Sequence, residues 1–183
     1  MNPTQPIATD DHEAAFLATP APDAVRRMRI RSALPPDAPR IAHLVNTWAD
    51  QSVMLHVSHE DVLQRLGEFV VAFDELDEAA GILACGALSV FSPTLAEIRS
   101  IAVAPACQGH GVGSMVVRFL MENAAALEID RLILLTKKPG FFARLGFYEI
   151  PERMMPEQFK HEAILGKNRT TTNKSIMMYQ FLA

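Results

Sequence analysis

The chain has little cysteine, few aromatic residues and no surplus of positive charge. Its 183 residues include two cysteines, 7% aromatic residues, and 17 Lys and Arg against 21 Asp and Glu, for a formal net charge of −4. Cys85 and Cys107 alone cannot build the disulfide framework of a small secreted domain. A mildly acidic chain also lacks the basic face typical of nucleic-acid-binding proteins, so we expect no nucleic-acid partner.

Long apolar runs and a leader-like N-terminus are also missing. No stretch of 18 consecutive apolar residues occurs, so the sequence predicts no membrane span and no membrane partner. The first residues, MNPTQPIATDDHEA, lack a basic segment followed by an apolar one, and therefore give no sign of a secretory signal. We expect a cytoplasmic protein.

The apolar content, 49%, is high enough for one globular domain with a substantial core. Residues 1–26 are rich in Ala, Pro, Thr and Asp, and we interpret them as an N-terminal tail that precedes a domain at 27–183. Strand and helix periodicities alternate along that domain. They predict a mixed sheet with helices on both faces, which is an α/β class (α+β in some schemes).

The expected elements follow from these periodicities and from turn residues. Helices are expected to begin near residues 35, 59, 112 and 141. Strands are expected at 28–31, 69–73, 80–88, 95–103, 131–136, 147–150 and 175–182. Residues 151–174 are polar, and no element is predicted there.

The stretch from Leu95 to Phe119 predicts a strand, a glycine-rich turn and a helix. The two-residue period of a strand would give one face a set of five alternate residues: Leu95, Glu97, Arg99, Ile101 and Val103. The turn at 108–113 has glycine at three of its six positions, just where the helix begins. A helix start offers free N–H groups and the positive dipole end, and glycines let a phosphate approach them. We expect this turn to bind a pyrophosphate.

The spacing of the glycines excludes two common phosphate-binding motifs. No Gly-Lys-Ser/Thr is present, which argues against a nucleotide P-loop. Gly109 and Gly111 begin a G-x-G pattern, but Ser114 stands where a dinucleotide fingerprint needs its third glycine. The competing interpretation is an ordinary strand–turn–helix, which explains poorly why three glycines should weaken a helix start by about 1 kcal/mol each.

Three segments in this order resemble the GNAT acetyltransferase superfamily. They are Ala-Glu-Ile-x-x-x-Ala-Val at 96–103, Gln108-x-x-Gly111-x-Gly113, and Phe-Phe-x-x-Leu-Gly-Phe at 141–147. The resemblance implies the GNAT fold, a mixed and mostly antiparallel sheet in which two central parallel strands splay apart. It also implies acetyl-CoA as co-substrate and no metal. His56 and His59 lie three apart, but no further metal ligands cluster with them, so we expect a solvent-exposed pair.

The resemblance also implies which residues hold acetyl-CoA. The pantetheine arm would pair with the backbone of Ile101, Ala102 and Val103. The pyrophosphate would meet main-chain amides of the turn, which comprises Gln108, Gly109, His110, Gly111, Val112, Gly113 and Ser114. Phe142 lies where many members carry a tyrosine that protonates the leaving thiolate, and phenylalanine cannot donate a proton. The acid is therefore another group, or the thiolate leaves with electrostatic support alone.

Glu97 occupies the position of the catalytic glutamate of several GNAT enzymes. A carboxylate there can take the ammonium proton of an amine acceptor, directly or through one water. A backbone N–H near Val103 would polarise the thioester carbonyl. The competing interpretation of Glu97 is an ion pair with Arg99, its same-face neighbour two residues along.

Residues 28–182 look similar to the acetyltransferase domain of amino-acid N-acetyltransferases, in particular of N-acetylglutamate synthases. This implies transfer to the α-amino group of L-glutamate, as in arginine biosynthesis. Two substrate carboxylates require basic donors; the candidates are Arg99, Lys137, Lys174 and Ser175. The early loop, Met54–Ser58, lacks the arginine common in the family, so either His56 substitutes for it or the substrate differs.

Two other functions stay open at this level. The chain could acetylate another small amine or a protein N-terminus. It could also be a catalytically silent acetyl-CoA-binding module that serves regulation or assembly, and the phenylalanine at 142 favours this view while Glu97 opposes it. A homodimer is compatible with each of these functions.

Overall fold

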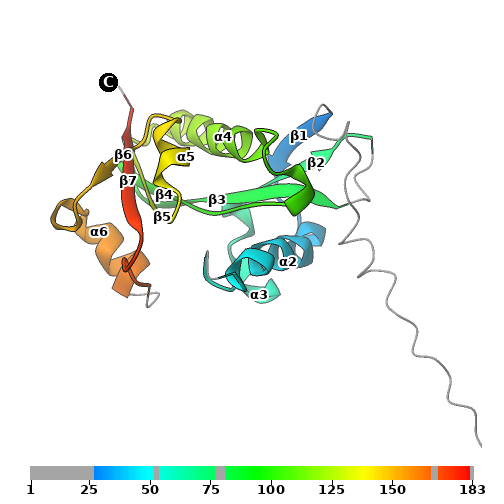
Figure 1. Ribbon diagram of the computed structural model, residues 1–183, viewed down its shortest axis with the longest axis horizontal. Coiled ribbons are helices and arrows are strands. Elements are labelled where there is room, and N and C mark those ends of the chain that lie inside the picture. Colours follow the sequence, from blue (N-terminus) through cyan, green and yellow to red (C-terminus); the bar gives the residue numbers. More distant parts are fainter. Residues whose placement is uncertain (1–26, 52–53, 77–80, 166–168, 182–183) are drawn as a thin grey trace, which may run out of the picture.

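The computed structural model describes residues 27–51, 54–76, 81–165 and 169–181. The segment interpreted as an N-terminal tail, residues 1–26, lies outside the described residues, so that interpretation stays a prediction. One seven-stranded sheet runs through the described chain, in the order β1-β2-β3-β4-β5-β7-β6 (Figure 1).

The strands confirm the predicted mixed sheet. They are β1 (Met28–Ser32), β2 (Phe69–Asp74), β3 (Ile82–Ser92), β4 (Leu95–Val103), β5 (Arg131–Thr136), β6 (Tyr148–Ile150) and β7 (Ser175–Gln180). Neighbouring strands are antiparallel except for β4 and β5, which run parallel. This parallel pair occupies the centre of the sheet.

Helices cover both faces, as Figure 1 shows. The longer helices are α2 (Ala38–Ala49), α3 (His59–Gln64), α4 (Val112–Ala126) and α5 (Pro139–Ala143). Short turns of helix occur at η1 (Pro35–Asp37), η2 (Leu66–Glu68), η4 (Pro105–Cys107) and η5 (Glu152–Met154). Between η5 and β7 lie α6 (Glu157–Phe159) and the π-helical η6 (Lys160–Leu165). These last elements fall in the stretch 151–174, where the sequence predicts none.

The buried apolar side chains of the described residues form three clusters, each where helices cover part of the sheet. Val116, Val117 and Leu120 of α4 pack on β2, β3, β4 and β5. On the other face, Ile41 and Val45 of α2 pack on β2 and β3. The third cluster joins α6 and η6 to β4, β5 and β7 and comprises Leu95, Ile133, Ile150, Met155, Phe159, Ala163, Ile176 and Met178. The α2 and α6 clusters share one face of the sheet, and the functional side chains of β4 lie between them.

The parallel strands β4 and β5 separate part-way along their length. They pair only at Leu95–Arg131, Ala96–Leu132 and Glu97–Ile133. Beyond Glu97 the two strands diverge, so the second half of β4 has an edge without a neighbouring strand. This confirms the predicted splay and places an opening directly beside 98–103.

A β-bulge at Ser100 corrects the expected alternation along β4. Cys85 of β3 lies opposite Ala102, and Ala87 lies opposite Arg99. Between these two pairs β4 has two residues where β3 has one, so β4 contains one extra residue. Ser100 absorbs it with φ of 55°. As a result Ile101 packs on the α4 side and Ala102 on the α2 side, the reverse of the predicted faces.

A capping box begins α3 and gives a stability test. The Ser58 hydroxyl accepts from the Asp61 N–H at 3.0 Å, and the Asp61 carboxylate accepts from the Ser58 N–H at 3.0 Å. We expect Ser58→Ala to lower the free energy of unfolding by about 1 kcal/mol at neutral pH, measured by denaturant titration. An effect no larger than that of Ser32→Ala, an exposed serine outside any cap, would contradict this.

The same cap has a pH dependence of known sign. Hydrogen bonds from the Ser58 backbone and side chain lower the pKa of Asp61. A carboxyl whose pKa is lower in the folded chain contributes stability above its ordinary range and loses it as pH falls through the folded value. The difference between wild type and Ser58→Ala should therefore shrink in acid.

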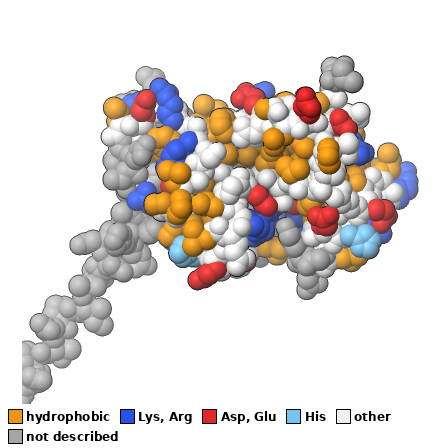
Figure 2. All heavy atoms as spheres, turned by 180° about the vertical axis from the view of Figure 1, so that it is seen from behind, with side chains coloured by type: hydrophobic (Ala, Val, Ile, Leu, Met, Phe, Trp, Pro, Cys, Tyr) orange, Lys and Arg blue, Asp and Glu red, His pale blue; other side chains and the backbone are white. Residues whose placement is uncertain are grey.

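Surface charge and helix composition bear on the expected partners. Figure 2, the view from behind, shows acidic and basic side chains interspersed with hydrophobic ones. Among the residues that the structure describes, no helix combines the length and the apolar character needed to cross a bilayer.

Candidate active site

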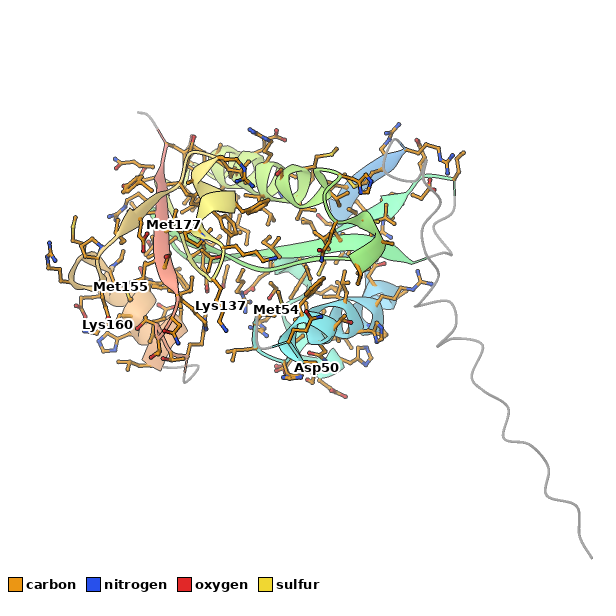
Figure 3. All side chains as sticks on the ribbon, in the orientation of Figure 1. Asp50, Met54, Lys137, Met155, Lys160 and Met177 are labelled. Carbon is orange, nitrogen blue, oxygen red and sulfur yellow. The ribbon has the colours of Figure 1, made fainter. Side chains whose placement is uncertain are left out.

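A cavity of about 860 Å³ lies at the splay between β4 and β5. Its walls come from the second half of β4, the end of β5, the glycine-rich turn, α5, and the loop after α2. Figure 3 labels Lys137 and Met54, which reach this space from the β5 side and the α2 side. Segments far apart in the chain thus converge where the sheet opens.

The glycine-rich turn forms one end of the cavity. Gly109 and Gly111 have φ of 77° and 82°, values that favour glycine. Gly111 is the N-cap of the 15-residue α4, and no side chain caps this helix start. The amides of Val112, Gly113 and Ser114 therefore begin a helix beside the cavity without a side-chain cap. This arrangement fits a pyrophosphate.

Gly113 also lets three elements meet closely. A Cβ at this position would lie 3.3 Å from a methyl group of Val103 and 3.5 Å from the Phe141 ring. Phe141 in turn stands edge-on to Phe142, with ring centroids 4.9 Å apart. The helix start, β4 and α5 therefore form one packed wall of the cavity.

The free edge of β4 presents Val103 to the cavity. The Ala104 N–H donates to the Leu83 carbonyl at 2.8 Å, and Val103 lies opposite Ala84. This geometry makes Val103 and Ala84 a non-hydrogen-bonded pair, so the Val103 N–H and carbonyl point away from β3. Ala102, the residue before Val103, forms a hydrogen-bonded pair with Cys85, so its N–H and carbonyl point toward β3.

Trp48 occupies part of this edge. Its indole Nε1–H donates to the Val103 carbonyl at 3.0 Å and its side chain lines the cavity. The bond ties the end of α2 to the last residue of β4, and it leaves the Val103 N–H for another acceptor. Trp48 thereby fixes the orientation of the 103–104 peptide, which directly follows the peptide carrying the Val103 N–H.

Glu97 is fully buried and pairs with Arg169, not with Arg99. Arg169 Nη1 donates to Glu97 Oε1 at 2.5 Å, across 72 residues of sequence. The second carboxylate oxygen, Oε2, is buried and has no hydrogen-bond partner among the described residues. The competing interpretation of Glu97, an ion pair with Arg99, is therefore wrong, because a residue from the segment before β7 reaches Glu97 instead.

Arg99 pairs with Glu68 at the end of η2, and its side chain is largely buried. Arg65 lies nearby: burial, followed by the charge of Arg99, lowers its pKa. Burial likewise lowers the pKa of Lys174, with the charges of Arg169 and Lys137 adding to the effect. Arg65 and Arg99 are thus close enough to repel each other. The same holds for Lys174 with Arg169 and Lys137.

Comparison with known proteins settles the family. Residues 30–149 match the model described as "Acetyltransferase (GNAT) family". The chain belongs to the GNAT family. The matched region contains β4, the glycine-rich turn, α4, β5 and α5, so it covers most of the cavity.

Several relatives of this GNAT protein are named amino-acid acetyltransferases. It is 39% identical over 121 residues to the amino-acid acetyltransferase of Mycobacterium tuberculosis, which covers 66% of this chain and 68% of that protein. It is 32% identical over 130 residues to an amino-acid acetyltransferase of Neisseria meningitidis, of which it spans 29%.

Solved structures give the same result. The Mycobacterium tuberculosis protein Rv2747, in complex with CoA and NLQ, has a TM-score of 0.73 at 32% identity, covering 84% of this chain and 99% of that one. N-acetylglutamate synthase from Neisseria gonorrhoeae, with CoA and N-acetyl-glutamate, has a TM-score of 0.74 at 26% identity over 85% of this chain. This chain spans only 35% of that synthase. The GNAT protein described here is an acetyl-CoA-dependent N-acetyltransferase of the amino-acid acetyltransferase type.

The structure gathers most of the predicted site residues of this GNAT enzyme at the cavity. Those in its walls are Arg99, Ile101, Val103, Gln108, Gly109, Gly111, Val112, Gly113, Ser114, Lys137, Phe142 and Lys174. Glu97, Ala102, His110 and Ser175 are not part of the walls. Glu97 lies behind Arg169, while Ala102 packs toward α2.

Sequence reasoning missed further wall residues, and those that matter most for the chemistry are Trp48, Arg65, Phe141 and Arg169. Trp48 fits the apolar face of α2, and that helical period concealed its polar contact. Arg169 stands in a polar segment with no periodicity, so no local signal in the sequence could have assigned it to Glu97.

The two cysteines are structural thiols in this GNAT fold. Burial raises the pKa of Cys85 to about 12, so this thiol stays protonated and donates to the Ser100 carbonyl at 3.7 Å. It thereby supports the bulge. Burial also raises the pKa of Cys107, so neither thiol is prepared as a nucleophile.

The site contains no metal ligand set within the described part of the chain. His56, expected to be solvent-exposed, is exposed and bonds to Asp50 at 2.6 Å. Phe142 packs edge-on against Phe147. Tyr179 lies between Phe147 and Phe181, and Tyr148 is exposed, so neither tyrosine lines the cavity.

Proposed function

We propose that this enzyme transfers the acetyl group of acetyl-CoA to the α-amino group of L-glutamate. The observation that carries the proposal is the charge of the cavity walls: Arg65, Arg99, Lys137, Arg169 and Lys174 contribute positive charge, whereas Asp61 is the acidic wall residue among those described. A dicarboxylate suits such a lining, because charge-assisted hydrogen bonds to carboxylates are the strong ones. The names of the relatives support an amino-acid acceptor, and the similarity to an N-acetylglutamate synthase structure supports glutamate.

In this proposal the turn at 108–114 holds the pyrophosphate, and the edge of β4 at Ile101 and Val103 holds the pantetheine arm. The first-turn amides of α4 supply fixed positive potential without a metal. The Val103 N–H, which points into the opening, polarises the thioester carbonyl. Glu97 lies on the same strand, six residues before Val103, at the point where β4 still pairs with β5.

Glu97 acts as the general base in the proposed reaction. It takes a proton from the acceptor ammonium, directly or through one water, so an N–H bond breaks and an O–H bond forms on the carboxylate. The amine attacks the thioester carbonyl, the N–C bond forms and the C–S bond breaks, and the second proton lost from the nitrogen passes to the departing thiolate, directly or through water. Because Phe142 has no proton to give, the basic walls support the leaving thiolate electrostatically.

Arg99, Lys137, Lys174 and Ser175 stay our candidates for the substrate carboxylates. Arg99 has one nitrogen, Nε, that is buried without a hydrogen-bond partner in the described chain. Lys174 and Ser175 stand at the start of β7, and Lys137 follows the end of β5. Lys137 and Lys174 line the cavity from the β5 and β7 side, Arg99 lines it from β4, and Ser175 follows Lys174 outside the walls.

A thiol-release assay with acetyl-CoA and a panel of acceptors tests the function. We expect L-glutamate to give the highest kcat/KM, above L-glutamine, other amino acids and a peptide N-terminus. Turnover only with the other amines would select a GNAT enzyme of a different substrate class. Calorimetric binding of CoA without turnover of any acceptor would select the non-catalytic module.

A further inference from the structure

Arg169 stands between the cavity and the proposed base. Its backbone is fixed after η6 by a bond from its N–H to the Ile164 carbonyl at 2.8 Å. Its side chain is 13% exposed and lines the cavity, while Glu97, which it contacts, is 0% exposed and does not line it. An acceptor in the cavity therefore meets Arg169 before it meets Glu97.

The Arg169–Glu97 pair is only half satisfied. One guanidinium nitrogen bonds to one carboxylate oxygen, although both groups can make paired, parallel bonds. Glu97 Oε2 is left buried without a partner in the described chain. A buried polar atom without a partner is costly, so this arrangement can be displaced by a ligand that satisfies the guanidinium better.

We infer that Arg169 receives the α-carboxylate of the acceptor amino acid and, in doing so, exposes Glu97 to the acceptor's α-amino group. The inference rests on the proposed function for the role of Glu97 as base. The incoming carboxylate offers Arg169 the same chemistry as Glu97, with room for both of its oxygens. The base is therefore opened by the substrate that it deprotonates.

The position of the pair identifies which carboxylate binds. Glu97 must lie next to the reacting amine, and Arg169 is in direct contact with Glu97. In an amino acid, the carboxylate nearest to the amine is the α-carboxylate, attached to the same carbon. A side-chain carboxylate is several bonds farther away and suits the more distant basic groups, such as Lys137 and Lys174.

Kinetics on acceptors that lack one carboxylate test this assignment. The acceptors are L-glutamate, L-glutamine, and glutamate with its α-carboxylate converted to an amide. Wild type should prefer glutamate to its α-amide by at least about tenfold in kcat/KM. In Arg169→Ala this preference should fall to about one, with a raised KM for glutamate, an unchanged KM for acetyl-CoA, and an unchanged preference for glutamate over glutamine.

Two further variants keep the test decisive. Arg169→Lys retains the charge but not the planar fork, and should keep an intermediate preference. Arg153→Ala removes an exposed arginine of the same segment and should match wild type. If Arg169→Ala does not fold, as judged by thermal melting, the same comparison is made with Arg169→Lys, and a wild-type preference in that variant overturns the assignment.

The possible failures are separable. If Arg169→Ala lowers kcat/KM equally for glutamate and for its α-amide, Arg169 merely neutralises Glu97 and the inference is wrong. If another amino acid is the preferred acceptor, glutamate falls, and the same comparison with that amino acid's α-amide decides on Arg169. If no α-amino acid is acetylated, both proposals are overturned.

Discussion

Replacement of Glu97 by Gln is expected to lower kcat about 10²- to 10³-fold at neutral pH, the range typical of a lost general base. Glutamine has nearly the same shape, so the side chain can still occupy the buried position that Glu97 fills. It cannot accept the ammonium proton, and the acceptor then reacts only in its rare neutral form. Raising the pH should therefore recover part of the rate.

Affinity for CoA separates this effect from a loss of structure. The turn at 108–114 does not contact Glu97 through any interaction seen in the structure, so calorimetry should give the same dissociation constant for CoA in Glu97→Gln and wild type. Glu68→Gln is the matched control, because it also breaks an arginine–carboxylate pair, with Arg99, but leaves the Glu97 carboxylate in place. We expect its kcat to fall far less. A Glu97→Gln enzyme with an unchanged kcat would remove Glu97 from the mechanism.

The sequence was informative where function needs local geometry. The glycines at 109, 111 and 113 predicted a turn before the helix, and Gly109 and Gly111 adopt the positive φ that favours glycine. Pro105 predicted that the strand stops by that residue, and β4 ends at Val103; the helical period from Val112 predicted α4, which begins there. The apolar run at 131–136 predicted a buried strand, and β5 has these bounds. Each signal depends on residues that are neighbours in the chain.

The sequence failed where a strand departs from its period. The alternation along β4 holds from Leu95 to Arg99 and then reverses, because Ser100 takes up an extra residue. A bulge depends on the facing strand as much as on the strand that contains it. On β3, Gly86 leaves room for the side chain of Ile101. The residues of β4 alone therefore do not say which face of the strand changes.

The stretch before β7 was missed for a related reason. Met155, Phe159 and Ala163 are buried at four-residue spacing, which is a helical signal. Pro156 and several charged residues interrupt the pattern, so a short α6 and a π-helical turn form there instead of one regular helix. This irregular segment delivers Arg169 to Glu97, a contact that depends on tertiary packing alone.

Gly86→Ala is expected to lower the free energy of unfolding by about 2 kcal/mol, because it overpacks the core behind the bulge. A Cβ at position 86 would lie 2.6 Å from Cδ1 of Ile101, 2.9 Å from Cγ1 of Val116 and 3.0 Å from Cδ1 of Leu120. Ile101 has the end atom that can move most easily, and its side chain lines the cavity. The variant should therefore also bind CoA more weakly.

A double-mutant cycle with Ile101→Val tests the mechanism of this loss. The valine lacks Cδ1, so the Gly86→Ala/Ile101→Val double variant should be destabilised by about 1 kcal/mol less than the sum of the single variants. Gly67→Ala is the matched control: no atom lies within 4 Å of its Cβ position, and the change should be close to neutral in denaturant titration. Strict additivity in the cycle would show that Ile101 does not press on position 86, and that the bulge keeps its geometry for another reason.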